Sequence, residues 1–383
     1  MLYRNYGKTN ESVSILGFGC MRLPVLDGNP VKIDEKKALP MLRYAIDAGV
    51  NYVDTAYPYH GTGMESGGAS EPFVAKALKD GYRARVKLAT KLPSWLIKTR
   101  SDMDAYLNRQ LERLETDHID FYLVHSLNQD YWPVLKAAGI HEFLDQALSD
   151  GRIRYAGFSF HDQLGLFKEI VDDYDWSFCQ IQYNYLDENY QAGREGLRYA
   201  AEKGLGLAIM EPLRGGHLAN LPPAIQTVME QNAIQRTPVE WALRWVWNHP
   251  EVSVALSGMG AMEQVVENVR IAQTATASSF TAPETAVIDR VKQLFKEKTR
   301  VPCTACGYCM PCPVGINIPA CFALYNDDWM HEGPPATRKS RYQNLTATSA
   351  LASQCAACGQ CESHCPQSLP IREELKQVAA LFE

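Results

Sequence analysis

Nine of the eleven cysteines lie in one short stretch, between residues 303 and 365. Eight of them form two runs in which a cysteine recurs every third residue, except that the last interval of the second run is one residue longer. The runs are Cys303, Cys306, Cys309 and Cys312, and Cys355, Cys358, Cys361 and Cys365. A proline follows each run. At the other end, the first residues of the chain lack the apolar stretch of a secretion signal. This crowding indicates metal ligation by thiolates rather than disulfides.

The second run has the spacing of bacterial ferredoxins, and the resemblance implies two [4Fe–4S] clusters. In two-cluster ferredoxins, the fourth cysteine of each run ligates the other cluster. Carried over, one cluster takes Cys303, Cys306, Cys309 and Cys365, and the other takes Cys355, Cys358, Cys361 and Cys312. A pair of structural zinc sites is the alternative, although zinc ribbons separate their two knuckles by a longer loop. Cys321, Cys20 and Cys179 are left over, and we expect them to be buried free thiols.

Upstream of the cysteines, short apolar runs alternate with amphipathic stretches. The predicted strands are 14–17, 52–54, 86–90, 119–124, 155–158, 178–183, 206–210 and 252–256, and helical patterns include 35–48, 71–79, 102–114 and 238–247. This alternation predicts a parallel sheet with crossover helices, and its length is that of a (β/α)8 TIM barrel. A doubly wound sheet is the competitor, but the turn after the first strand lacks the third glycine of its phosphate-binding motif.

A small, polar stretch at 274–283 is typical of a boundary loop, and a helix is predicted at 284–298. We therefore expect two domains: residues 1–280 form the barrel, and residues 281–383 form a small, mainly α-helical, ferredoxin-like domain with two clusters.

Four polar residues follow or end three consecutive predicted strands. They are Asp54 and Tyr59, then Lys91, then His125. In a barrel all four emerge at the C-terminal face, where active sites lie. A phenol has a pKa of about 10 and is too weak an acid at neutral pH, but a nearby ammonium favours the phenolate. We expect Asp54 to hold Lys91 charged, and His125 to orient a substrate carbonyl or share the proton.

At these positions the chain resembles the aldo-keto reductase family, from about Gly7 to Asn268. The matching motifs are Asp54-Thr55-Ala56-x-x-Tyr59, Thr90-Lys91 and Leu123-Val124-His125. The resemblance implies that Tyr59 is the general acid, that Lys91 and Asp54 tune it, and that His125 orients the carbonyl. The whole chain resembles the branch of the family that carries a C-terminal ferredoxin-like domain.

The same resemblance implies a nicotinamide nucleotide, NAD(H) or NADP(H). Positions that match its contacts are Ser159 and Gln180 at the carboxamide, Met210 where the family stacks an aromatic ring, Gly258 in a glycine-rich loop, and Glu267 and Asn268 at the adenine. A glycine-rich loop followed by a helix can cradle phosphate through backbone N–H groups. That loop offers no basic residue for a 2′-phosphate. A flavin would couple one- and two-electron steps, but the sequence has no motif specific to one.

Three hypotheses for function follow. The first is an oxidoreductase acting on a small-molecule carbonyl or alcohol, whose two clusters connect the barrel site to a one-electron donor or acceptor protein. The second is an NAD(P)H-dependent carbonyl reductase whose clusters only fold the tail or sense oxidants. The third is an electron-transfer module that uses the barrel as a docking scaffold. Four barrel residues in register argue against the third hypothesis.

The composition narrows the partners further. A net charge of −6 over 383 residues does not favour a nucleic-acid binder, which needs basic stripes. No run approaches the ~18 apolar residues that a membrane-spanning helix requires. We expect the protein to be cytoplasmic.

Overall fold

Parallel strands close into a barrel in the computed structural model, which describes residues 1–331 and 335–383. The barrel strands are β3 (Leu16–Gly19), β4 (Tyr52–Asp54), β5 (Lys87–Leu92), β6 (Ile119–Leu127), β7 (Ile153–Phe160), β8 (Phe178–Gln182), β9 (Gly206–Met210) and β10 (Val254–Ser257). They pair in chain order, and β10 pairs with both β9 and β3 to complete the closure. The predicted barrel is confirmed.

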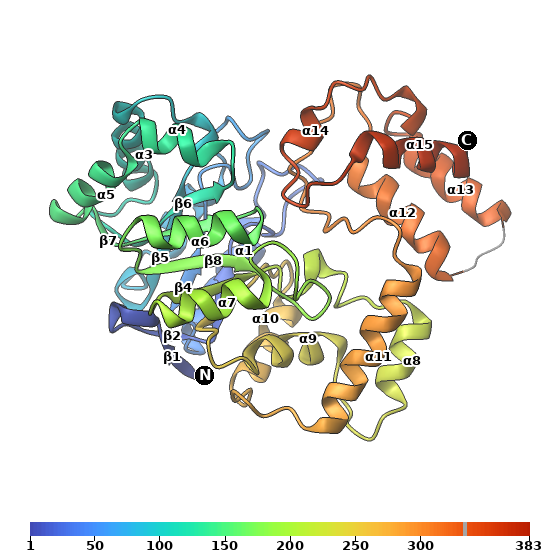
Figure 1. The fold of residues 1–383 in the computed structure, drawn as a ribbon, viewed down its shortest axis with the longest axis horizontal. Helices are drawn as coiled ribbons and strands as arrows, with labels where there is room; N and C mark the ends of the chain where they lie inside the picture. The colour runs from blue at the N-terminus through green and yellow to red at the C-terminus, as the bar shows by residue number, and fades with distance from the viewer. Residues whose placement is uncertain (332–334) are drawn as a thin grey trace. The chain divides into compact units, whose positions relative to one another are not determined.

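Helices connect the strands and cover the outside of the barrel (Figure 1). They are α1 (Glu35–Asp47), α2 (Ser70–Ala77), α3 (Arg100–Arg113), α4 (Tyr131–Ala137), α5 (Ile140–Ser149), α6 (Leu164–Asp173), α7 (Gly193–Glu202), α9 (Pro238–Trp247) and α10 (Met262–Ala272). Nowhere in the described residues is a helix both long enough and apolar enough to cross a membrane.

Aromatic side chains fill the end of the barrel at which the strands begin. An antiparallel hairpin of β1 (Tyr3–Asn5) and β2 (Ser12–Ser14) places Tyr6 against Tyr52, Phe121 and Phe178, with ring centroids 4.8–5.6 Å apart. Gly206, at the start of β9, leaves room for this ring, because a Cβ there would lie 2.4 Å from Tyr6 Cδ2. The opposite end, where the strands finish, is therefore the one available for a site.

Two strand boundaries differ from the sequence prediction for identifiable reasons. The first barrel strand begins at Leu16 rather than at residue 14, because Ser12–Ser14 pair with β1 instead. Strand β6 runs on to Leu127, past a register shift at which Ser126 adopts a positive φ of 55°. Irregularities of this kind redirect side chains at the rims of barrels.

The cysteine runs belong to a helical unit with its own core. Its helices are α8 (Pro223–Glu230), α11 (Ala282–Lys298), α12 (Ile318–His331), α13 (Pro335–Thr346), α14 (Gln360–Ser363) and α15 (Ile371–Phe382). The first cysteine run is a loop that precedes α12, whereas the second run includes the short helix α14, which carries Cys361, and precedes α15. Buried side chains that include Phe322, Tyr342 and Phe382 form the core. The Ala350 N–H donates to the Gly315 oxygen at 2.9 Å, which connects the segment after the first run to the segment before the second.

By its internal contacts the chain divides into two compact units. One comprises Met1–Pro212 and Ala242–Ser279, and the other comprises Leu213–Trp241 and Phe280–Glu383. The segment before Trp241 groups with the second unit because α8 packs on α11 and Arg236 pairs with Glu284 at 2.5 Å. The division predicted from the sequence, 1–280 and 281–383, keeps that segment with the barrel and stays a prediction.

Candidate functional site

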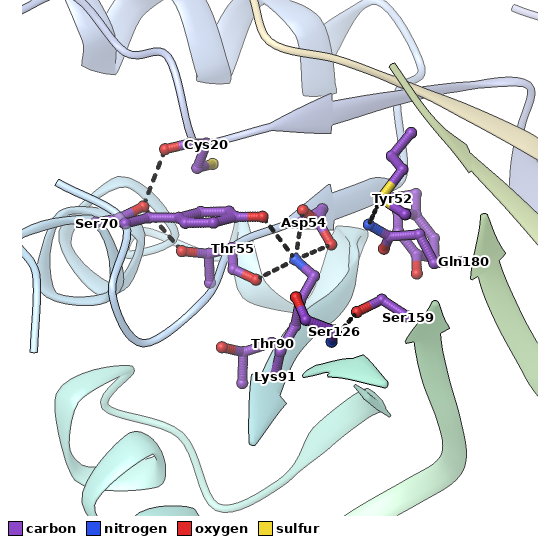
Figure 2. Close-up of polar contacts among 12 residues, drawn as sticks. Cys20, Tyr52, Asp54, Thr55, Ser70, Thr90, Lys91, Ser126, Ser159 and Gln180 are labelled. Atoms are coloured by element: carbon purple, nitrogen blue, oxygen red, sulfur yellow. Dashed lines mark hydrogen bonds and ion pairs between the residues drawn. The ribbon is translucent and has the colours of Figure 1, made fainter. Parts of the chain in front are cut away.

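The Lys91 ammonium is the centre of a hydrogen-bonded group at the ends of β4 and β5. Its Nζ donates to both carboxylate oxygens of Asp54, at 2.7 and 2.8 Å, and to the backbone oxygen of Thr55 at 2.8 Å. A further contact, at 3.3 Å, reaches the hydroxyl of Tyr59. Figure 2 shows the contacts of Lys91 with Asp54 and Thr55 converging on one nitrogen. The structure thus brings together three of the four residues that the sequence singled out.

This ion pair is shielded from water. Lys91 is 0% exposed and Asp54 is 3% exposed. Burial raises the pKa of Asp54 and lowers the pKa of Lys91, and the attraction between the two charges opposes both shifts. A buried ion pair is stable only when its remaining hydrogen-bonding positions are filled, and the Thr55 oxygen and Tyr59 hydroxyl fill those of Lys91.

Tyr59 lies on the loop after β4, and the start of α2 fixes its backbone. The Ser70 N–H donates to the Tyr59 oxygen at 3.2 Å, and the Gly68 N–H donates to the Tyr57 oxygen at 2.8 Å. A Cβ on Gly68 would lie 1.9 Å from the Tyr59 oxygen, so only glycine permits this close approach. The ring that carries the hydroxyl is therefore held at both its backbone and its tip.

His125, on β6, completes the group as a neutral imidazole. Its ring centroid lies 6.2 Å from that of Tyr59, and the two rings are nearly perpendicular. Burial, the Lys91 charge and neighbouring His161 place the pKa of His125 well below its ordinary value. Its Nδ1 is buried and has no hydrogen-bond partner among the described residues. A neutral imidazole can orient a polar group without adding a positive charge beside Lys91.

The residues matched to the nicotinamide carboxamide lie on neighbouring strands, β7 and β8. Ser159 Oγ accepts a hydrogen bond from the Ser126 N–H at 2.7 Å (Figure 2). Gln180 Nε2 donates to Met210 Sδ at 3.5 Å, while Gln180 Oε1 is buried without a partner in the part of the chain that the structure describes. An amide oxygen in this state can accept a hydrogen bond from a carboxamide NH2 group, so this end of the site fits a nicotinamide.

The positions matched to the adenine lie on α10. Asn268 is buried, donates to Ser257 Oγ at 3.0 Å, and leaves Oδ1 without a partner within residues 1–331 and 335–383. Glu267 is half-buried, and Gly258 is exposed in the loop before the helix. The structure does not bring these three residues to the Lys91 group. They lie instead in the loop after β10 and on α10.

Arg22 is a basic residue at the Gly258 loop that the sequence analysis missed. Its aliphatic carbons lie against Gly258, where a Cβ would be 3.2 Å from Arg22 Cγ, and its guanidinium is 4.0 Å from Glu211. It follows β3, more than 230 residues before Gly258 in the chain. No local motif could have revealed it. Only the pairing of β10 with β3 brings the two loops together.

In the helical unit, one pocket joins cysteines of both runs. Cys303, Cys306 and Cys309 line it together with Cys365, and apolar residues that include Ile318 and Phe322 complete its wall. The Ala305 N–H donates to Cys303 Sγ at 3.4 Å. Among the described residues, no three His, Cys, Asp or Glu side chains converge on one point as ligands of a single ion would. Thiols arranged around a pocket fit a polynuclear cluster.

The second set of thiols is more open to water. Cys358 is exposed, and Cys355, Cys361 and Cys312 are partly buried. Burial and the charge of Glu362 raise the pKa of Cys361 to about 11, and Cys355 and Cys358 contribute less to the same shift. Cys20, Cys179 and Cys321 are buried and form no disulfide in the described part of the chain.

Comparisons with known proteins agree with this architecture. The model of the Aldo/keto reductase family matches residues 15–288, and the model of a 4Fe-4S dicluster domain matches residues 302–370. The chain therefore belongs to the aldo/keto reductase family. It is an oxidoreductase with a C-terminal 4Fe-4S dicluster domain.

Individual relatives are distant. An aldo-keto reductase of Fusarium vanettenii is 27% identical over 255 residues, which cover 57% of this chain and 66% of that protein. The uncharacterized oxidoreductase YqkF of Bacillus subtilis is 24% identical, over 74% of this chain and 94% of its own. The structure of an aldo-keto reductase from Bacillus halodurans, in its holo form, matches with a TM-score of 0.63 and 28% identity, over 76% of this chain and 96% of that one.

The neutral state of His125 can be tested by nitrogen-15 NMR of histidine-labelled protein, with the signal assigned by its loss in His125→Gln. At pH 5.5, a histidine with the ordinary pKa of about 6.5 is about nine-tenths protonated. We expect His125 to remain neutral there. Below about pH 6.5, His125 binds a proton in the unfolded chain but not in the folded site. His125 therefore lowers the free energy of unfolding as the pH drops below about 6.5. A protonated signal for His125 at pH 5.5 would contradict this account.

Exchange of the fourth cysteine between runs can be tested with Cys365→Ala. Although Cys365 belongs to the second run, we expect its loss to free the thiols of Cys303, Cys306 and Cys309 for alkylation and to remove about half of the iron. Mass spectrometry of the alkylated native protein identifies the freed thiols, and Cys321→Ala is the control that leaves the iron unchanged. Alkylation of Cys355 and Cys358 instead would show that each run holds its own cluster.

Proposed function

We propose that the barrel interconverts a small-molecule carbonyl and its alcohol, with Tyr59 moving the proton, and that two [4Fe–4S] clusters exchange electrons with this site. The observation that carries the proposal is the buried Lys91 ammonium, which contacts both the Asp54 carboxylate and the Tyr59 hydroxyl. A buried ammonium at this distance favours the phenolate, which is the form that Tyr59 takes after it gives up its proton. Membership of the aldo/keto reductase family supports the reaction class.

Tyr59 acts as the acid when the carbonyl is reduced. Its hydroxyl donates a proton to the substrate oxygen as that oxygen gains negative charge, and the phenolate left behind is stabilised by the Lys91 ammonium at 3.3 Å. In the reverse direction the phenolate removes the proton of the alcohol. Asp54 keeps the ammonium charged and fixes its position, and both side chains are buried.

His125 positions the substrate. Its ring lies 6.2 Å from the Tyr59 ring, so a ring N–H could donate to a substrate oxygen that approaches the Tyr59 hydroxyl. Because burial and the Lys91 charge keep the pKa of His125 low, the ring stays neutral and does not compete with Lys91 for the phenolate. His125 therefore directs the carbonyl oxygen toward Tyr59.

The donor set supports a nicotinamide nucleotide. Ser159 and Gln180 would hold the carboxamide, Met210 would pack against the ring in place of an aromatic side chain, and Gly258, Glu267 and Asn268 would hold the phosphate and adenine end. Arg22 adds a cation at the Gly258 loop. When bound, the nucleotide supplies hydride transfer. Thioethers pack favourably on aromatic rings, so Met210 preserves the contact with a softer surface.

The second part of the proposal is that the clusters exchange electrons with the barrel site. The pocket that joins Cys303, Cys306, Cys309 and Cys365 supports binding of one cluster. The ferredoxin-like spacing of Cys355, Cys358 and Cys361 supports the second. In this proposal Cys312 completes the second ligand set. A partner that carries single electrons would then supply or withdraw them through these clusters. A structural or sensing role for the clusters is the competing proposal.

Replacing Tyr59 by Phe tests the acid directly. We expect the rate of carbonyl reduction, measured with a panel of small aldehydes and ketones, to fall by roughly 10²- to 10⁴-fold, because the proton donor is lost while the ring is kept. The cluster absorbance near the visible charge-transfer bands stays unchanged.

Tyr57→Phe is the matched control. Tyr57 lies on the same loop and is buried, but its hydroxyl contacts Arg109 at 3.3 Å and not Lys91. We expect its activity to stay within about threefold of the wild type, since ~0.6 kcal/mol at the transition state is about that factor. If Tyr59→Phe were as active as Tyr57→Phe, the assignment of the acid would be wrong.

A further inference from the structure

A second buried carboxylate, Glu71, lies behind the Lys91 group and takes no part in the mechanism above. It is 0% exposed and is the second residue of α2. Its Oε1 accepts hydrogen bonds from Thr90 Oγ1 at 2.9 Å and Gln110 Nε2 at 2.7 Å, and its Oε2 accepts one from Arg113 Nε at 2.8 Å. A buried charge is costly unless it is paired in this way, so the arrangement calls for an explanation.

Gln110 links Glu71 to the backbone of Lys91 through hydrogen bonds. Its Nε2 also donates to the backbone oxygen of Lys91 at 3.0 Å, and its Oε1 accepts from the Tyr122 hydroxyl at 2.8 Å. Gln110 is fully buried on α3, while Tyr122 lies on β6. Glu71 and Gln110 thus hold the backbone at the end of β5, from which the Lys91 side chain extends to Asp54.

Ser70, the residue before Glu71, forms hydrogen bonds with the loop that carries Tyr59. The Ser70 N–H donates to the Tyr59 oxygen at 3.2 Å. The Ser70 hydroxyl accepts from Thr55 Oγ1 at 2.8 Å and donates to the Cys20 oxygen at 3.1 Å (Figure 2). Thr55 in turn offers its backbone oxygen to the Lys91 ammonium. Two consecutive residues therefore fix the backbone of Tyr59 and the strand that carries Lys91.

We propose that Glu71 and Gln110, with Ser70, form a positioning device that sets the distance between the Lys91 ammonium and the Tyr59 hydroxyl. The device acts through the backbone and touches neither substrate nor cofactor. It rests on the proposed function, because the distance matters only if Tyr59 moves the proton. Its physical basis is that a helix start, rather than a flexible loop, links the two groups.

Thr90 offers a clean test because its side chain belongs to the device alone. Thr90→Val keeps the shape but removes the hydroxyl that donates to Glu71, whereas Thr90→Ser keeps the hydroxyl. We expect Thr90→Val to lower kcat by roughly tenfold to hundredfold with a small change in KM, since misplacement of about 1 Å has effects of that size. Thr90→Ser is expected to restore most of the rate.

The pH profile separates positioning from a merely structural role. If the ammonium moves away from Tyr59, the phenolate is less favoured, and the basic limb of the pH–rate profile shifts to higher pH in Thr90→Val but not in Thr90→Ser. Groups facing the phenol that also bear on this limb are Lys91, Asp54 and His125, and none of them is changed. A purely structural role would lower thermal stability and leave the limb in place.

Gln110→Met provides an independent variant with a similar shape and no hydrogen bond to the Lys91 oxygen. We expect the same fall in kcat and the same shift of the basic limb. Wild-type kcat and an unmoved limb in the folded Thr90→Val or Gln110→Met protein would overturn the positioning role. If Tyr59→Phe itself proves active, the proposed function fails instead, so the two failures are distinguishable.

Discussion

The ion pair between Lys91 and Asp54 is the interaction on which the rest of the site depends. It is buried at the ends of neighbouring parallel strands, where water cannot share in its solvation. Burial lowers the pKa of Lys91, and the attraction of the Asp54 carboxylate opposes that loss of charge. The charge is what makes a neighbouring phenol useful as an acid. In the proposed mechanism, Asp54 therefore supports Tyr59 through Lys91.

Barrel closure is what makes this pair possible. Strands β4 and β5 pair in parallel, so Asp54 and Lys91 reach the same rim from positions 37 residues apart. Aromatic rings around Tyr6 fill the opposite end, which leaves the C-terminal rim for chemistry. Helices α2 and α3 then support the rim from outside through Glu71 and Gln110. The fold supplies two layers of support, one inside the barrel and one behind it.

Much of this could be predicted from the sequence, because the informative residues repeat a local pattern. Asp54, Lys91 and His125 each stand near the end of a predicted strand, and parallel strands bring such residues together. The cysteine runs are local in the same sense. The contribution of Glu71 could not be predicted, because its partner Gln110 lies 39 residues away and both sit in ordinary helical patterns. Arg22 was hidden for the same reason, and the hairpin displaced the predicted start of the first strand.

The direct test of the account is an anaerobic titration of the iron-reconstituted protein with NADH and then NADPH, followed by visible absorbance and low-temperature EPR. The account predicts that at least one nucleotide bleaches the iron–sulfur absorbance and produces a reduced-cluster signal, because the barrel site and the clusters exchange electrons. Clusters that respond to dithionite but to neither nucleotide would contradict it.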